Sequence, residues 1–215
     1  MLAKVCAASD MVKKVIVAPG NGGMSKEFDA FPLQVEDNDA IVALARRQEI
    51  DLVVVGPEVP LCNGAVDSLE AANIPAYGPK KAGAELEGSK AFTKDFLNRH
   101  GIPTASYGNF SDADEALAFL EETSLPIVVK ASGLAAGKGV IICQTKEEAA
   151  TAVKEMLSGE SFGESGREVV IEEFLDGEET SLHVICSGES YVALPMSQDH
   201  KKVGEGDTGP NTGGM

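Results

Sequence analysis

Apolar runs of four or five residues alternate with segments of helical periodicity along the first 88 residues. The runs are rich in valine and isoleucine, as is typical of buried parallel strands, and the segments between them place apolar residues on one face of a helix. The predicted elements are, in chain order, a helix at 2–8, a strand at 14–18, a helix capped by Asp37 and Asn38, a strand at 52–55, a helix at 66–72 and a strand at 75–77. This alternation predicts most of a parallel α/β domain.

Helix-start signals and short strands follow in the rest of the chain. Ser89 is placed to cap a helix on which Lys90 and Lys94 lie four residues apart on one face. Thr145 and Glu148 have the spacing of a capping box. The other predicted elements are a helix at 111–122, strands at 127–130, 140–143 and 169–172, a mobile Gly- and Ser-rich loop at 159–167, and paired strands at 180–185 and 191–194. This mixture predicts a small α+β module.

A glycine-rich loop between two of these strands is the strongest candidate for chemistry. The segment 126–143, PIVVKASGLAAGKGVIIC, places Gly, Ala and one lysine between two β-branched runs. Such a loop lets backbone N–H groups approach an anion, and Lys130 and Lys138 can add positive charge, so a nucleotide polyphosphate is the simplest ligand. The loop lacks the spacing, the Ser or Thr and the following helix of a Walker A motif. A plain hairpin with a flexible tip is the alternative.

Two further loops come directly after predicted strands, where open α/β sheets place their ligands. The first loop contains Pro19, Gly20 and Asn21, and the second contains Gly56, Pro57 and Glu58. Plain turns with a solvated carboxylate are the alternative interpretation. Of the histidines near the end of the chain, His183 falls within a strand pattern typical of a core position, whereas His200 lies among Asp and Lys and is a functional candidate.

Composition narrows the classes of function. The 215 residues are 43% hydrophobic and carry a formal net charge of −16, which argues against a nucleic-acid or anionic-membrane surface because either needs a basic face. No apolar run approaches the length of a membrane span, and the first residues lack the apolar core of a signal peptide. The four cysteines form no C-x-x-C pair, so we expect small buried thiols in a reducing, cytoplasmic compartment rather than structural zinc.

Taken together, these segments resemble the ATP-grasp superfamily and, within it, the phosphoribosylamine–glycine ligase family. The segments that carry the resemblance are APGN at 18–21, VVGPEVPL at 54–61, LEGSKAFTKDF at 86–96, KASGLAAGKGV at 130–140, IEEFLDGEE at 171–179, and SQDHKK with GDTGPNTGGM between 197 and 215. The resemblance implies ATP-dependent ligation of glycine to 5-phosphoribosylamine through a glycyl phosphate, a step of purine biosynthesis. It also implies ATP and Mg²⁺ as cofactors, with Mn²⁺ as the alternative metal, and only small-molecule partners.

The resemblance further implies an order of domains. A partial parallel-sheet, Rossmann-like pre-ATP-grasp domain spans residues 1–88, a linking helix 89–103, the ATP-grasp lid subdomain 104–178, and the start of the ATP-grasp core 179–215. The family's opening strand and glycine-rich phosphate loop are missing from this pattern, and the family's metal ligands are expected beyond Met215. We therefore expect an incomplete copy, poorly soluble or partly unfolded by itself, because strand edges and apolar surface are left exposed.

The same resemblance assigns site residues to three groups. The ATP phosphates are assigned to Lys90, Lys130, Gly133, Gly137, Lys138 and Gly139. The adenine and ribose are assigned to Glu172, Glu173, Leu175 and Glu179, with main-chain groups of Glu173 and Leu175 meeting the base. The phosphoribosylamine and glycine sites are assigned to the two strand-end loops and to Asp199, His200, Lys201, Asp207, Thr208, Pro210, Asn211 and Thr212.

Three other functions remain as alternatives at this point. A catalytically inactive nucleotide-binding or subunit-interaction fragment would share the same motifs. A different ATP-grasp enzyme, such as a biotin-type carboxylase, is disfavoured by the DHKK and GPNTGG strings in the last 20 residues. An NAD-dependent oxidoreductase is disfavoured because no G-x-G-x-x-G follows a predicted strand.

Overall fold

The structure is a computed structural model that describes residues 1–135, 139–200, 202–206 and 208–211. The chain divides into two compact units, Met1–Gly88 and Ser89–Met215, and each is described by itself.

The first unit is a mixed α/β unit with small parallel sheets. Its elements are α1 Leu2–Ala7, β1 Ile16–Val17, the 3-10 helix η1 Met24–Lys26, β2 Asp29–Ala30, α2 Asn38–Arg47, β3 Val53–Val54, α3 Glu58–Cys62, α4 Ala65–Ala71, β4 Ala76–Tyr77 and α5 Lys81–Gly88. β1 pairs with β2 and β3 with β4, both in parallel. The α/β class is confirmed, while α3 and α5 were not predicted from the sequence.

Helices α2 and α4 pack against one face of the β3–β4 sheet. Ala45, Leu69 and Ile74 are the buried centre of this cluster, and Val53 and Val55 pack against it. The residues that alternate with these two valines point the other way, and Leu52 remains 55% exposed. The prediction of a fully buried strand was therefore wrong, because this sheet has an apolar cluster on only one of its faces.

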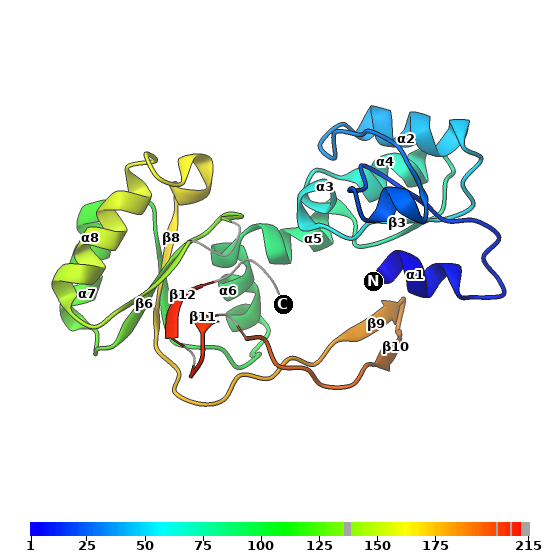
Figure 1. The fold of residues 1–215 in the computed structure, drawn as a ribbon. Helices are drawn as coiled ribbons and strands as arrows, with labels where there is room; N and C mark the ends of the chain where they lie inside the picture. The colour runs from blue at the N-terminus through cyan, green and yellow to red at the C-terminus, as the bar shows by residue number, and fades with distance from the viewer. Residues whose placement is uncertain (136–138, 201, 207, 212–215) are drawn as a thin grey trace. The chain divides into compact units, whose positions relative to one another are not determined.

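The second unit is built around a four-stranded antiparallel sheet in the order β5-β8-β6-β7. Its elements are α6 Lys90–Arg99, β5 Tyr107–Phe110, α7 Ala113–Glu122, β6 Ile127–Ala131, β7 Val140–Cys143, α8 Lys146–Leu157, η2 Gly163–Gly166, β8 Val169–Glu173, and the hairpin strands β9 Val184–Ser187, β10 Ser190–Ala193, β11 Lys202–Gly204 and β12 Thr208–Asn211. Figure 1 shows α7 and α8 side by side along one face of the four-stranded sheet, with α6 beyond the other face.

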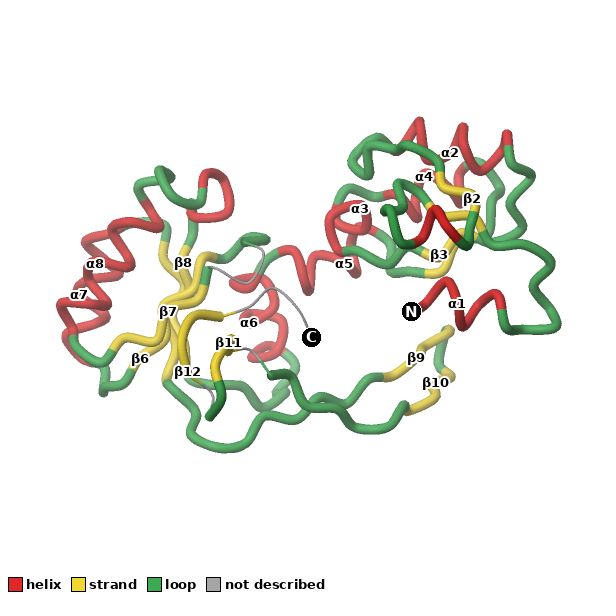
Figure 2. Tube along the Cα trace, viewed as in Figure 1, coloured by secondary structure: helices red, strands yellow, loops and turns green. Residues whose placement is uncertain are grey.

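The two faces of this sheet differ in chemistry because side chains alternate along each strand. Ile127, Val129 and Ala131 of β6 join Val169 and Ile171 of β8 in an apolar cluster beneath α7 and α8. The residues between them face α6, and they include Lys130 and Glu172. Figure 2 shows β6, β7 and β8 between α7 and α8 on one side and α6 on the other. The charged positions of the two central strands therefore lie on the α6 side.

Strands β9 and β10 form a two-stranded sheet of their own. Every residue of both strands is exposed, and so is His183 just before them. The expectation that His183 is a core residue was therefore wrong. The expectation of buried cysteines is confirmed for Cys143 and wrong for the others: Cys6 and Cys62 are half-buried, and Cys186 in β9 is exposed.

The glycine- and serine-rich segment at 159–167 includes the 3-10 helix η2, which packs near the end of α8. Gly166 is buried, and a Cβ atom at that position would lie 2.3 Å from the carbonyl oxygen of Met156. This close approach explains the glycine. The segment is thus partly regular structure, where the sequence predicted only a loop.

Candidate nucleotide site

The first turn of α6 is fixed to the end of β6. Ser89 caps the helix by accepting a hydrogen bond from the Phe92 amide at 3.1 Å. The amide of Lys90 donates to the carbonyl oxygen of Ser132 at 2.8 Å, and the amide of Ala91 donates to the Ser132 hydroxyl at 3.1 Å. Ser132 therefore receives two amides of the first helical turn, which places Lys90 beside the glycine-rich segment.

Glu172 lies between two lysines on the α6 face of the sheet. In the register Val128 pairs with Glu172 and Lys130 with Val170, so Lys130 and Glu172 are diagonal neighbours on one face. One carboxylate oxygen of Glu172 forms an ion pair with Lys130 and the other with Lys94 of α6. The Glu172 side chain is 7% exposed, so this carboxylate is held by two ammonium groups away from solvent.

Asp95 provides a second polar contact between α6 and the sheet. Its carboxylate accepts hydrogen bonds from the Tyr107 hydroxyl at 2.8 Å and from the Asn109 side-chain amide at 3.0 Å. Burial, followed by the contact with Asp95, raises the pKa of Tyr107. These contacts fix the helix against β5, so the lysines of α6 are positioned by a hydrogen-bonded framework.

The start of the glycine-rich loop is anchored by Ser165. The Gly133 amide donates to the Ser165 carbonyl oxygen at 3.0 Å, and the Ser165 hydroxyl donates to the carbonyl oxygen of Leu134 at 2.7 Å. The Lys90 ammonium donates to the Gly133 carbonyl oxygen at 3.0 Å. A Cβ atom on Gly133 would lie 2.7 Å from the Ser165 Cα. The backbone of Ser165 therefore lies so close to Gly133 that this position requires glycine.

The far end of the loop returns to the same strand. The Ala131 amide donates to the Gly139 carbonyl oxygen at 2.8 Å, and a Cβ atom on Gly139 would lie 2.6 Å from that of Ala135. The structure thus brings Gly133, Gly139, Lys90 and Lys130 to one end of β6. Gly137 and Lys138, also predicted for this site, lie outside the described residues.

The segment after β8 carries the residues predicted for adenine and ribose. The Glu173 carboxylate accepts hydrogen bonds from the Ser106 amide at 3.1 Å and from its hydroxyl at 3.2 Å, so this side chain ties β8 to the start of β5. Leu175 is 66% exposed and Glu179 is also exposed. The side chain of Glu173 is therefore engaged in a structural contact, unlike the side chain of Leu175, which is open to solvent.

The loop after β1 has a local structural role. The Asn21 side chain accepts hydrogen bonds from the amides of Gly23 and Met24, both at 3.0 Å, and so begins η1. Gly20 has a φ of 74°, and a Cβ atom there would lie 3.0 Å from that of Ala30. Pro19 follows Ala18 through a cis peptide bond. A turn packed this closely needs glycine at its centre.

The loop after β3 lines a pocket of about 380 Å³. Gly56 and Glu58 contribute to its wall with residues of α3 and α5, including Cys62 and Glu87. Glu58 is the first residue of α3 and Pro57 is its N-cap, so the predicted loop carboxylate instead begins a helix. Burial, followed by the charges of Glu87 and Glu58, raises the pKa of the Cys62 thiol. Among the described lining residues, none comes from the β1 loop.

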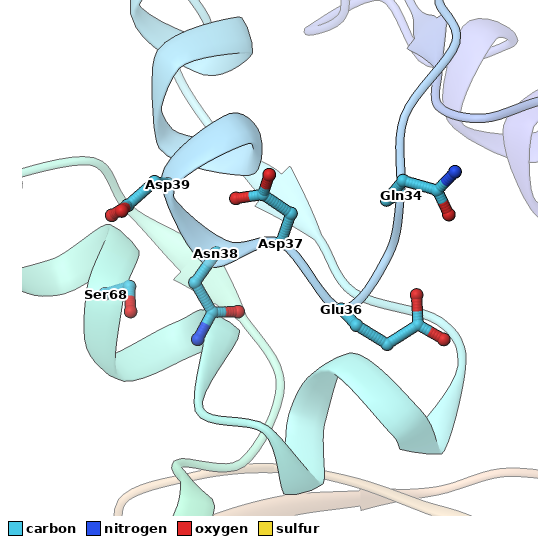
Figure 3. A pocket seen from close by; sticks show the side chains of 6 residues that line it. All are labelled: Gln34, Glu36, Asp37, Asn38, Asp39 and Ser68. Carbon is cyan, nitrogen blue, oxygen red and sulfur yellow. The ribbon is translucent and has the colours of Figure 1, made fainter.

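A second hollow, of about 730 Å³, lies at the start of α2 and is drawn in Figure 3. Asp37 caps that helix by accepting from the Ala40 amide at 2.9 Å. The hollow contains none of the residues predicted for ligand binding; its lining residues are Gln34, Glu36, Asp37, Asn38, Asp39 and Ser68. Its carboxylates face solvent and are accounted for by helix capping and a favourable helix dipole.

The residues predicted near the end of the chain fall around the β11–β12 hairpin. Asp199 is half-buried and His200 is exposed. The Thr208 hydroxyl donates to the carbonyl oxygen of Glu205 at 2.9 Å. Pro210 and Asn211 belong to β12. Lys201, Asp207 and Thr212 lie outside the described residues.

The described part of the chain offers neither a metal-binding cluster nor a helix that could span a membrane. It holds no group of three or more His, Cys, Asp or Glu residues arranged to bind a metal ion. None of its helices is long and apolar enough to cross a membrane.

Comparison with known proteins identifies the family. Residues 1–87 match the family model described as phosphoribosylglycinamide synthetase, N domain, and residues 88–215 match the ATP-grasp (A) domain of the same synthetase. The chain belongs to the phosphoribosylglycinamide synthetase family. The resemblance predicted from its motifs is confirmed.

Relatives of this family resemble the chain along its whole length. The phosphoribosylamine–glycine ligase of Vibrio vulnificus is 56% identical over 211 residues, which are 97% of this chain and 49% of that protein. The solved structure of the Thermotoga maritima ligase matches with a TM-score of 0.80 and 31% identity, over 99% of this chain and 51% of the other. The chain therefore spans about half the length of the relatives it matches.

A more distant enzyme shares the fold. The N5-carboxyaminoimidazole ribonucleotide synthetase of Thermus thermophilus matches with a TM-score of 0.61 and 19% identity, over 83% of this chain and 45% of the other. At this identity the match concerns the fold alone.

Three residues of the site were missed in the sequence. Lys94 was noticed for its spacing from Lys90 but was given no role, and Ser132 and Ser165 were not considered. The four-residue spacing is the signal that could have placed Lys94 beside the site. Ser132 and Ser165 carry no such signal, because their partners lie 41 and 31 residues away in the chain.

Proposed function

We propose that this chain takes part in the ATP-dependent ligation of glycine to 5-phosphoribosylamine and contributes the nucleotide site. The observation that carries the proposal is the 56% identity, over nearly the whole chain, to a protein named phosphoribosylamine–glycine ligase. The geometry supports it: three lysines, Lys90, Lys94 and Lys130, gather at the α6 face of a chain whose net charge is −16. A local cationic group in an acidic protein favours an anionic ligand.

The proposed reaction has two steps. A carboxylate oxygen of glycine attacks the γ-phosphorus of ATP, and ADP leaves, which gives glycyl phosphate. The amine of 5-phosphoribosylamine then attacks the carbonyl carbon, loses a proton and displaces phosphate to form glycinamide ribonucleotide. Neither step needs a covalent enzyme nucleophile, so the protein contributes positioning and charge neutralisation.

We assign the phosphates to Lys90, Lys130 and the glycine-rich loop that contains Gly133, Gly137, Lys138 and Gly139. Lysine ammonium groups and closely approaching amides are the donors that phosphate oxygens accept from. The nucleoside is assigned to the segment after β8: Glu172, the main chain of Glu173 and Leu175, and Glu179. The Glu173 side chain is tied to Ser106, and the Glu173 amide donates to the Ser106 carbonyl oxygen at 2.9 Å, so the main-chain assignment at this residue falls on its carbonyl oxygen.

The remaining assignments concern substrates, metal and compartment. The phosphoribosylamine and glycine sites are assigned to the loops after β1 and β3 and to the predicted residues between Asp199 and Thr212. Mg²⁺, or Mn²⁺ in its place, would neutralise the ATP phosphates. No residue of this chain is assigned as its ligand; the described residues hold no group of three or more His, Cys, Asp or Glu residues arranged to bind a metal ion. Scattered cysteines without a disulfide among them favour the cytoplasm.

The test is ADP release by this chain with ATP, Mg²⁺, glycine and 5-phosphoribosylamine. We expect release that depends on both glycine and the amine, and a loss of at least tenfold in Lys130→Met because a phosphate-facing charge is removed. The control is Lys154→Met, which removes an exposed lysine of α8. ATP binding without turnover would favour the alternative, an inactive nucleotide-binding or subunit-interaction fragment. A folded chain that binds no ATP contradicts both the ligase and the nucleotide-binding fragment, and leaves the subunit-interaction fragment.

A further inference from the structure

Lys94 has no assigned role, although it makes one of the two ion pairs of Glu172. We propose that Lys94 is a positioning residue: it offsets the charge of Glu172 and so leaves the Lys130 ammonium available to a phosphate. This inference rests on the proposed nucleotide site and adds a residue to it. It concerns the combined charge of Lys94, Lys130 and Glu172, which together are called the Glu172 trio.

The three side chains differ in exposure. Glu172 is 7% exposed, Lys94 13% and Lys130 26%. Lys94 is thus the inner lysine and Lys130 the outer one. A carboxylate this deeply buried needs a compensating charge, since an unpaired buried ion is strongly destabilising. The inner lysine can provide that compensation without being reached by a ligand.

The contacts of Lys94 fix its ammonium in this inner position. It donates to the Thr104 hydroxyl at 2.7 Å and to the Ala105 carbonyl oxygen at 3.5 Å. It also lies 5.6 Å from the centre of the Tyr107 ring, within the range of a cation–π interaction. These two hydrogen bonds come in addition to its ion pair with Glu172. Lys94 is therefore built in as a structural cation.

Charge counting shows what Lys94 contributes. Two ammonium groups and one carboxylate give the Glu172 trio a net charge of +1. Without Lys94, the trio would be a neutral pair of Lys130 and Glu172, and the carboxylate would compete with any phosphate for the same ammonium. The lysine that faces Glu172 from α6 therefore determines whether the lysine on β6 can act on an anion.

The test measures binding of inorganic tripolyphosphate to the folded chain by calorimetry. This probe has no base, so the result does not depend on a contact between Glu172 and adenine. The variants set the net charge of the Glu172 trio: Lys94→Met gives 0, Glu172→Gln gives +2, and the double variant returns it to +1. Thr104→Val is the matched control, because it removes a hydrogen bond of Lys94 but no charge.

We expect Lys94→Met to weaken binding about tenfold, or ~1.4 kcal/mol. Glu172→Gln should bind at least as tightly as the wild type, and the double variant should return to within about threefold of it. This recovery separates charge compensation from a packing role, since a packing defect would persist in the double variant. If Lys94→Met alone lowers the folded fraction, binding by the double variant still distinguishes charge compensation from packing.

Unchanged binding in Lys94→Met, a double variant as weak as Lys94→Met, or no binding by the wild type would overturn the inference. ADP release by the wild-type chain tests the ligase separately. Tripolyphosphate binding that depends on Lys94, without ADP release, would leave the inference standing and count against the ligase. ADP release together with tripolyphosphate binding that does not depend on Lys94 would support the ligase and overturn the inference.

Discussion

Ser132 and Glu172 are the two polar residues that are buried among the described part of the chain. Burying a polar group is costly unless it has partners. Ser132 meets this requirement with the first turn of α6, and Glu172 with Lys94 and Lys130. Both sets of partners come from elements that also carry the proposed phosphate contacts. Residues needed for local stability are therefore the same ones that assemble the candidate site.

Gly133 provides a test at a single residue. Gly133→Ala places a methyl group 2.7 Å from the Ser165 Cα, so the backbone must shift, and we expect a loss of about 1–3 kcal/mol in the free energy of unfolding. Thermal and urea unfolding measure this loss. Gly22→Ala is the control, because a Cβ atom there has no neighbour within 4 Å. Equal stability of the two variants would contradict the close approach.

At the scale of elements, α8 begins with a reciprocal cap. The Thr145 hydroxyl accepts from the Glu148 amide at 3.2 Å, and the Glu148 carboxylate accepts from the Thr145 amide at 3.3 Å and the Gln144 amide at 2.7 Å. Four buried residues of α8 belong to the apolar cluster beneath the helix. The cap therefore holds a helix that covers the back of the sheet.

Thr145→Ala removes this cap, and we expect the free energy of unfolding to fall by about 1 kcal/mol. Thr151→Ala is the matched control in the same helix, since its hydroxyl donates only to the Glu147 carbonyl oxygen one turn earlier. Alanine is the better helix former at that exposed position, so the control should be neutral or slightly stabilising. Chemical denaturation compares the two, and a control as destabilised as Thr145→Ala would argue against capping.

The helix starts could be predicted from the sequence because capping is local. Asp37, Ser89 and Thr145 each bind an amide three residues later, as their spacing indicated. The exposure of Leu52 and His183 could not be predicted, because it depends on how many strands pair and which face is covered. α3 was missed because Gly56, Pro57 and Glu58 indicated a loop. Pro57 is instead the N-cap of α3 and Pro60 lies in its first turn, where proline is tolerated.

The candidate site was also predictable only in part, because some of its contacts depend on how distant elements pack. The glycine-rich loop and Lys130 stand out in one short segment of sequence. Lys94 and Glu172 are 78 residues apart (172 − 94), and their contact depends on α6 packing on the sheet. Motifs therefore located the segments, while the pairing of charges needed the fold.

At the scale of the whole molecule, each unit contains its own protected thiol. Burial, with a smaller effect of Glu148, raises the pKa of Cys143 in the second unit. Cys62 in the first unit also has a raised pKa, and Cys186 is exposed. The thiolate is the reactive form, so a raised pKa means less thiolate at a given pH and a rate that climbs as pH increases.

We expect iodoacetamide at pH 8 to label Cys186 first, Cys62 more slowly and Cys143 last. Peptide mapping by mass spectrometry measures the order, with the urea-unfolded chain as control, where the differences should disappear. Raising the pH should accelerate labelling of Cys62. Labelling of Cys143 as fast as Cys186 in the native chain would contradict its burial.

The alternation of charged and apolar positions on β8 also bears on how the sheet reaches its native pairing. A slip of β8 by one residue would exchange its two faces. Glu172 would then enter the apolar cluster beneath α7 and α8, without either lysine, while Ile171 would leave it. An unpaired buried carboxylate costs several kcal/mol. The residue at the centre of the candidate site thus also discriminates against misaligned strands during folding.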